Sequence, residues 1–195
     1  TYHAVRTLER AGADCIQLED QVSPKRCGHF AGKDVVEASE MIGKIKAACD
    51  AHRDKDLLIM ARTDAAAVHG FNAAVERAQQ YAEAGADLLF VEAVTELEHV
   101  RALPQRLSTP QLMNMVIGGK TPITSAQELG QLGYGLVLYA NAALQGALAG
   151  MQRTLTQLRE TQRIDEDPGL VTPFAERQRL VGKGVWDGLE EKYLG

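Results

Sequence analysis

The sequence repeats one nine-residue frame, and this repeat limits the folds that the chain can adopt. "AGADCIQLE" at 11–19 and "AGADLLFVE" at 84–92 share the start AGAD, a run of apolar residues and a final glutamate. A glycine in this position closes a helix, and the aspartate after it opens a strand. The copies lie 73 residues apart, which suits two successive strand–helix units, since one unit needs roughly 30 residues or more. The repeat therefore predicts alternating helices and strands.

Apolar periodicity predicts the same alternation along the rest of the chain. Continuous apolar runs predict strands at 14–19, 56–63, 87–92, 110–115 and 135–140. Helical spacing predicts helices at 2–11, 38–51, 72–84, 95–107, 124–132 and 141–161, with Asn72 as the cap of the third. Strands that are apolar on both faces and alternate with helices are typical of a parallel sheet covered by helices. We therefore expect one α/β domain over 1–195, whose C-terminal tail, 165–195, holds short helical pieces.

Composition excludes several classes of protein. The net charge of -5 and the lack of a basic stripe argue against nucleic acid as the main partner. No apolar run approaches the ~20 residues that cross a bilayer. The cysteines, Cys15, Cys27 and Cys49, are an odd and sparse set that fits reduced thiols better than a disulfide framework. We expect a cytoplasmic protein.

Polar residues stand where the predicted strands end. Glu19, Arg62, Glu92 and Asn114 end or nearly end four successive strands, and ligands of parallel α/β folds bind at the carboxyl ends of strands. Each residue alone could be a solvated strand end, but together they favour a binding site. Arg62 could bind a substrate carboxylate, or it could form a buried salt bridge with Glu92 or Asp64.

The loop after the first strand carries a second set of candidate residues. Glu19 and Asp20 are neighbours in an extended segment, so they should point to opposite faces, and only one can reach the site. In the loop, Lys25, Arg26 and His29 surround Cys27, and nearby cations lower the pKa of a thiol. Gly28 allows the loop to approach a ligand closely. The alternative is a solvated basic turn with an incidental cysteine.

The number of predicted strands leaves two architectures open. Five strands suit an open sheet, but no GxGxxG loop follows any of them. A closed eight-stranded barrel usually needs ~250 residues, so a barrel would lack its first units here. Because the chain begins in mid-helix by pattern, we expect a piece of a longer protein. "GGKT" at 118–121 is not a P-loop, since Asn114 stands where that motif needs a glycine.

Four segments resemble the isocitrate lyase / phosphoenolpyruvate mutase superfamily. "EDQVSPKRCGHFAGK", "ARTDA", "AGADLLFVEA" and "NMVIGGKTP" follow the order and spacing of that family. The KRCGH segment is similar to the carbon–carbon lyase branch, which includes isocitrate lyase, 2-methylisocitrate lyase and 2,3-dimethylmalate-type lyases. Sequences labelled carboxyvinyl-carboxyphosphonate phosphorylmutase also carry it.

The resemblance implies a fold and an assembly. It implies a (β/α)8 TIM-type barrel, of which this chain lacks about the first three βα units. It also implies a homo-oligomer, a dimer or a tetramer, in which the C-terminal helix is swapped onto a neighbour.

The resemblance also implies an activity, a cofactor and residue roles. The activity is Mg²⁺-dependent retro-aldol cleavage of a small 2-hydroxy di- or tricarboxylate, of the 2-methylisocitrate or 2-alkylmalate type, to an α-keto acid and a carboxylate. Mn²⁺ is an alternative metal. Cys27 would protonate the carbanion carbon, while Lys25, Arg26 and His29 would bind the leaving carboxylate or poise the thiol. Glu19 would contact the metal, mostly through water. The remaining candidates would bind substrate: Arg62, Glu92, Asn114 and Gly28.

Two departures from the family bear on function. Its principal metal-binding aspartates lie on strands that would precede residue 1. In addition, Ile117 stands where the family usually has an acid, which alters the polarity of the pocket, so the resemblance does not specify the exact substrate. The alternatives are a phosphonomutase, an oxaloacetate decarboxylase on the same fold, or a truncated barrel that only binds or assembles.

Overall fold

The computed structural model describes residues 1–26, 32–119, 121 and 125–194. The chain divides into two compact units, Thr1–Ala140 and Asn141–Gly195. Every predicted site residue belongs to the first unit. Of these, Cys27, Gly28 and His29 lie outside the described residues.

The described part of the first unit is built on five parallel strands. They are β1 (Cys15–Glu19), β2 (Leu58–Thr63), β3 (Leu88–Val91), β4 (Leu112–Asn114) and β5 (Leu136–Leu138). The order β1-β2-β3 forms one sheet and β4-β5 forms a second, and both are parallel. A parallel bridge between Leu89 and Gln111 connects β3 to the segment that enters β4. The strands thus lie side by side in chain order, which confirms the predicted parallel α/β class.

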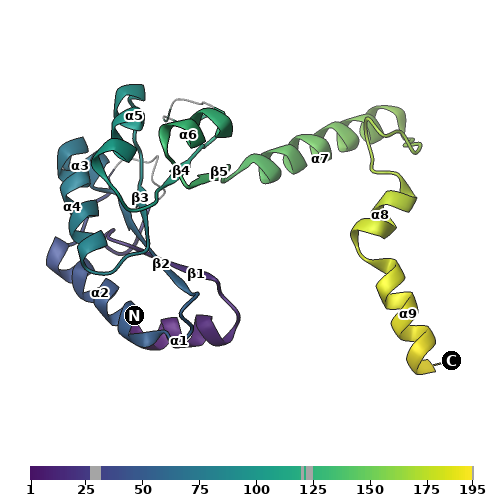
Figure 1. Ribbon diagram of the computed structural model, residues 1–195. Coiled ribbons are helices and arrows are strands. Elements are labelled where there is room, and N and C mark those ends of the chain that lie inside the picture. The colour runs from purple at the N-terminus through teal and green to yellow at the C-terminus, as the bar shows by residue number, and fades with distance from the viewer. Residues whose placement is uncertain (27–31, 120, 122–124, 195) are drawn as a thin grey trace. The chain divides into compact units, whose positions relative to one another are not determined.

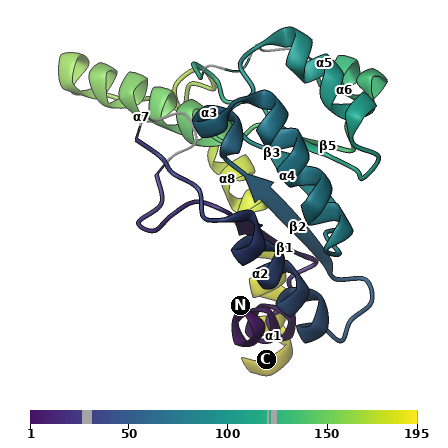
Figure 2. The same cartoon turned by 90° about the vertical axis from the view of Figure 1, so that its left-hand side faces the viewer.

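Helices cover one face of β1–β3. The helices of this unit are α1 (Tyr2–Arg10), α2 (Ala38–Ala51), α3 (Ala65–His69), α4 (Phe71–Glu83), α5 (Leu97–Arg106) and α6 (Ala126–Leu132). Figures 1 and 2 show α2 and α4 along the same face of the three strands. The main core lies there, and its fully buried side chains include Met41, Ile45, Val75, Tyr81 and Leu89. The apolar core therefore lies between these helices and the sheet, and the polar residues lie at the carboxyl ends of the strands.

The second unit is helical. It contains α7 (Ala142–Thr161), α8 (Phe174–Leu180) and α9 (Lys183–Leu194) (Figure 1). Along α7, apolar residues recur at alternating steps of four and three residues: Leu144, Leu148, Met151, Leu155 and Leu158. All five are exposed. None of the helices in the described part of the chain is long and apolar enough to span a membrane.

One local prediction was wrong, and the error occurs at the turn before α4. Asn72 is not the cap of this helix, because Gly70 takes that position with φ 88°. The short helix α3 precedes it, and a glycine at positive φ lets the chain turn sharply between two helices. The side chain of Asn72 instead accepts a hydrogen bond from Arg106 Nη1 at 2.6 Å.

We expect Leu89→Ala in the intact protein to lower the free energy of unfolding by about 2–5 kcal/mol, because it opens a cavity in a closed core. Urea unfolding followed by circular dichroism measures this. Leu97→Ala is the matched control, since Leu97 is 40% exposed and its truncation should change stability by about 0.5 kcal/mol or less. Equal losses for both variants would contradict the assignment of the core.

Candidate functional site

The register of the strands brings the predicted site residues to one edge of the sheet. Glu19 of β1 pairs with Arg62 of β2, and Arg62 pairs with Phe90 of β3. Register partners in a sheet share a face, and Glu92 follows Phe90 by two residues, so it points the same way. Side chains from three strands therefore meet on the face opposite to α2 and α4.

Arg62 is the centre of this group. Its Nε lies 2.8 Å from Asp64 Oδ2 and its Nη2 lies 3.2 Å from Asp64 Oδ1, which makes a two-point contact. Its Nη1 is 3.5 Å from Glu92 Oε2, and its Nε is 3.5 Å from Glu19 Oε2. Burial alone would lower the pKa of Arg62, but the hydrogen bonds and charges of the carboxylates outweigh burial and raise it. The guanidinium is therefore a permanent, buried cation at the strand ends.

Both acidic partners that the sequence suggested for Arg62 are present. Glu92 is 2% exposed and Asp64 is fully buried. Burial works to raise the pKa of Asp64, but its contacts with Arg62 and Lys33 prevail and lower it. The predicted buried salt bridge of Arg62 is therefore present, with both Asp64 and Glu92. It keeps the guanidinium at the carboxyl ends of the strands.

Asn114 extends the site to β4. Its Nδ2 donates to Glu92 Oε2 at 3.3 Å. Its Oδ1 is buried and has no hydrogen-bond partner among the described residues. A buried acceptor without a donor is costly unless a ligand or water supplies one. The structure therefore brings together four of the predicted residues: Glu19, Arg62, Glu92 and Asn114.

Asp20 points to the opposite face, as the alternation from Glu19 predicts. Its Oδ2 accepts hydrogen bonds from Thr63 Oγ1 at 2.7 Å and from Tyr81 Oη at 2.8 Å. Its Oδ1 accepts from the backbone N–H of Asp64 at 3.0 Å. Burial raises the pKa of Tyr81, and the charge of Asp20 raises it further, so the phenol keeps its proton and donates. Asp20 thus joins the end of β2 to α4.

The segments on either side of 27–31 pair with each other. Gln21 forms an antiparallel bridge with Val35 across these residues. Within the preceding segment, the Gln21 amide bonds the backbone of Arg26 twice, with its Oε1 accepting from N–H and its Nε2 donating to the carbonyl, both at 2.8 Å. Val22 N–H donates to the carbonyl of Asp34 at 2.9 Å. At Gly32, φ is 76° and an added Cβ would lie 2.8 Å from Arg26 Nη1. These contacts define the stem of the loop.

Two lysines connect this stem to the strand ends. Lys25 Nζ lies 3.3 Å from Glu19 Oε2, and its side chain is more than half exposed. Lys33 Nζ lies 3.0 Å from Asp64 Oδ1, and its side chain is only 3% exposed. The sequence alone predicts no role for Lys33 or for Tyr81. The available signal was the position of Lys33 in the loop motif, but only the tertiary contact with Asp64 gives it a function.

A metal ion would need more ligands than this part of the chain provides. Mg²⁺ takes about six oxygen ligands, and no group of three or more potential ligand residues lies together in 1–26, 32–119, 121 and 125–194. Glu19 is one suitable oxygen donor, although Lys25 and Arg62 already lie near its carboxylate. Among the described residues, Glu19 could therefore supply one ligand of a metal site, but these residues do not form a complete site.

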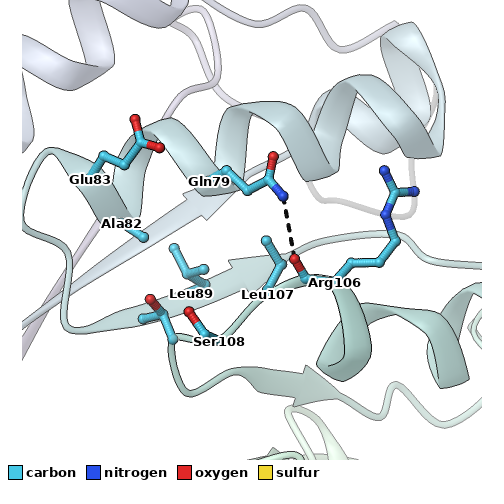
Figure 3. Close-up of a pocket in the computed structure, with 8 residues that line it drawn as sticks. Gln79, Ala82, Glu83, Leu89, Arg106, Leu107 and Ser108 are labelled. Atoms are coloured by element: carbon cyan, nitrogen blue, oxygen red, sulfur yellow. Dashed lines mark hydrogen bonds between the residues drawn. The ribbon is translucent and has the colours of Figure 1, made fainter.

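A separate cavity of about 230 Å³ lies between α4 and residues 106–109 (Figure 3). At its wall, Gln79 Nε2 donates to the carbonyl of Arg106 at 3.3 Å. Its lining includes none of the strand-end residues described above. The cavity is therefore not part of the candidate site.

We expect Asp64→Asn to lower the free energy of unfolding of the intact protein at pH 7 by about 3–5 kcal/mol, because it leaves buried cations without their partner. The folded pKa of Asp64 is lowered, so its contribution is present above about pH 4, the ordinary value, and is lost as pH falls through the folded pKa. Urea titrations from about pH 7 to about pH 3 should show the two proteins converging in acid. Asp165→Asn, in an exposed pair with Arg163, is the control and should differ little from the parent throughout. A constant difference at all pH values would contradict this account of Asp64.

Comparisons with known proteins agree with the geometry. The sequence pattern of the family described as phosphoenolpyruvate phosphomutase matches residues 2–159. The chain is 47% identical over 156 residues to 2-methylisocitrate lyase of Aeropyrum pernix, which covers 80% of this chain and 50% of that protein. It superposes on a crystal structure of 2,3-dimethylmalate lyase, a member of the PEP mutase/isocitrate lyase superfamily, with a TM-score of 0.89 and 32% identity, covering 98% of this chain and 64% of that one.

A further solved structure contains ligands. It is phosphonopyruvate hydrolase in complex with oxalate and Mg²⁺, with a TM-score of 0.81 and 27% identity, covering 100% of this chain and 68% of that one. The chain thus spans between half and about two thirds of the length of these proteins. The match over residues 2–159, together with the shared fold, shows that the chain belongs to the phosphoenolpyruvate phosphomutase family, within the PEP mutase/isocitrate lyase superfamily.

Proposed function

We propose that the intact protein is a cytoplasmic, Mg²⁺-dependent carbon–carbon lyase that acts on a small 2-hydroxy di- or tricarboxylate of the 2-methylisocitrate or 2-alkylmalate type. The observation that carries this proposal is the buried guanidinium of Arg62 at the strand ends, next to Glu92 and Asn114. A planar guanidinium binds a carboxylate through two parallel hydrogen bonds. The relatives named 2-methylisocitrate lyase and 2,3-dimethylmalate lyase support the same class of substrate.

The described residues suit the recognition of a hydroxy acid. Arg62 would bind one substrate carboxylate, and the unpartnered Oδ1 of Asn114 would accept a hydrogen bond from the hydroxyl on C2. Glu92, which is buried beside both residues, would orient them. Lys25 lies at the rim beside Glu19, where its charge would attract an anionic substrate.

The reaction would be a retro-aldol cleavage. The C2 hydroxyl gives its proton to a base, C2 becomes a carbonyl carbon, and the electron pair of the C2–C3 bond moves to C3. The thiol of Cys27 would then donate a proton to C3, with Arg26 and His29 poising the thiol and Gly28 allowing close approach. A bound Mg²⁺ would stabilise negative charge on the reacting oxygens, and Glu19 is the carboxylate in this chain that would face it through water.

The finer fold and the assembly belong to the same proposal. We infer that the five strands are the C-terminal part of a single (β/α)8 barrel domain, with 165–195 as its tail. The apolar stripe on α7 has the alternating spacing typical of a helix that packs against another helix or surface along its length. A second copy of the protein would cover this stripe in a dimer or tetramer with a swapped C-terminal helix.

The experiment that tests the function is direct. The intact protein is incubated with Mg²⁺ and, separately, with 2-methylisocitrate, isocitrate and 2-alkylmalates, and the release of α-keto acid is measured. We expect release from one of them. Cleavage of phosphonopyruvate instead, seen by phosphorus NMR, would favour phosphonate chemistry, to which the similarity with phosphonopyruvate hydrolase points. Decarboxylation of oxaloacetate alone would favour a decarboxylase, and no turnover of any compound would favour a barrel that only binds.

With the substrate identified, we expect Cys27→Ser to lower kcat by ~10²–10⁴, the range for loss of a positioned acid–base group. Cys49→Ser is the matched control, because Cys49 lies on α2 with its Sγ donating to the carbonyl of Gly85. Its kcat should stay within about twofold of the parent. Unchanged turnover in Cys27→Ser would remove the role given to this thiol.

We expect Leu148→Glu combined with Leu155→Glu to reduce the mass of the intact protein in solution to that of a monomer, because charged side chains cannot be buried unpaired in an apolar contact. Analytical ultracentrifugation measures this. Arg153→Glu, away from the stripe on the same helix, should leave the mass unchanged. If the double variant keeps the mass of the parent, the stripe is not the contact between copies.

A further inference from the structure

We propose that Asp64 is a positioning residue, which holds the guanidinium of Arg62 so that its Nη1–Nη2 edge faces the substrate carboxylate. This inference rests on the proposed function, since it assigns to Asp64 a part in substrate binding that it exerts through Arg62. Asp64 itself is fully buried just after β2, where it contacts Asp20 and Lys33 as well as Arg62.

The contact of Asp64 with Arg62 selects one edge of the guanidinium. The Asp64 carboxylate receives hydrogen bonds from Nε and Nη2, at 2.8 and 3.2 Å. These two nitrogens form the side edge of the planar group, so the end edge, Nη1 and Nη2, remains for a second carboxylate. Nη1 is also the atom nearest Glu92, at 3.5 Å from its Oε2. The side-edge contact thus directs the end edge toward Glu92 and Asn114.

A second contact fixes the plane of the same group. The Cζ atom of Arg62 lies 4.9 Å from the centroid of the Phe90 ring, in a cation–π arrangement. Phe90 is 2% exposed and pairs with Arg62 in the strand register. Asp64 holds the guanidinium within its plane and Phe90 supports its face, so rotation is restricted in both senses.

Asp64 is anchored independently of Arg62. Its backbone N–H donates to Asp20 Oδ1 at 3.0 Å, and Asp20 accepts a further hydrogen bond from Tyr81 of α4. Lys33 Nζ, from the loop stem, lies 3.0 Å from Asp64 Oδ1. The outer helix layer and the loop stem therefore fix the position of the Asp64 carboxylate. The carboxylate in turn fixes the position of the Arg62 guanidinium.

Charge balance alone does not account for Asp64. Two other carboxylates, Glu19 and Glu92, lie 3.5 Å from nitrogens of Arg62. They compensate the cation, but their nearest contacts with it are longer than those of Asp64. Only Asp64, among the carboxylates described around this arginine, makes two contacts at hydrogen-bonding distances. The particular contribution of Asp64 is therefore to orient the guanidinium of Arg62.

Two variants of the intact protein separate the orientation of Arg62 by Asp64 from the compensation of its charge. Asp64→Glu keeps the charge and moves the carboxylate by one methylene, and Asp64→Asn keeps the shape and removes the charge. Oxalate, a small dicarboxylate, is the probe, and its affinity is measured by calorimetry in the presence of Mg²⁺. We expect both variants to bind oxalate about tenfold more weakly, because the charge-assisted hydrogen bonds that orient Arg62 are displaced or lost.

A double-mutant cycle asks whether Asp64 acts through Arg62. Arg62→Lys removes the planar fork and should weaken oxalate binding by ~10–100-fold. Adding Asp64→Glu to Arg62→Lys should then cause a further loss of less than about twofold, because coupled residues are not additive. Glu9→Gln is the stability control. Glu9 accepts hydrogen bonds from the N–H groups of Arg53 and Asp54 ahead of β2, so this variant should lower the melting temperature and leave oxalate affinity unchanged.

The outcomes are distinguishable from those of the lyase assay. Unchanged oxalate affinity in Asp64→Glu would overturn the positioning role and leave only charge compensation, and fully additive losses in the double variant would also overturn it. If Asp64→Asn does not fold, the proposal is tested by Asp64→Glu and by the double-mutant cycle of Asp64→Glu with Arg62→Lys. A parent that binds oxalate but cleaves no substrate would overturn the lyase proposal alone, and a parent that does not bind oxalate would overturn this inference as well.

Discussion

The buried cation of Arg62 is the interaction on which the rest of the site depends. A guanidinium taken out of water is tolerated only when carboxylates surround it, and here Glu19, Asp64 and Glu92 do so from the ends of three adjacent strands. This requirement explains why the strand ends are acidic. It also explains why a polar cluster can exist beside a closed apolar core without destabilising it.

The separation of the two faces of β1 makes this arrangement possible. Glu19 and Asp20 are adjacent, yet the first contacts Arg62 and the second accepts a hydrogen bond from Tyr81 of α4. One carboxylate therefore serves the site while its neighbour fastens the end of β2 to the outer helices. Asp20 also accepts a hydrogen bond from the backbone N–H of Asp64, which links the outer helix layer to the site.

Much of this organisation could be predicted from the sequence, but some of it could not. The strand ends were predictable because apolar runs stop there, and the opposite directions of Glu19 and Asp20 follow from the period of a strand. The cap of α4 was not, because Asn72 is a good cap by type and only the backbone shows that Gly70 takes this position. The role of Lys33 was not either, because its partner Asp64 lies 31 residues away along the chain.

The sequence by itself determined the class of fold, the parallel order of its units, the edge at which polar residues gather and the family. It could do so because periodicity and motif spacing are local properties of the chain. Only the tertiary structure decided which carboxylate holds which edge of Arg62, that Phe90 supports its face, and that Lys33 and Asp20 anchor Asp64. Hydrogen bonds depend on distances of tenths of an ångström between groups far apart in the chain, and those distances exist only after the strands have packed.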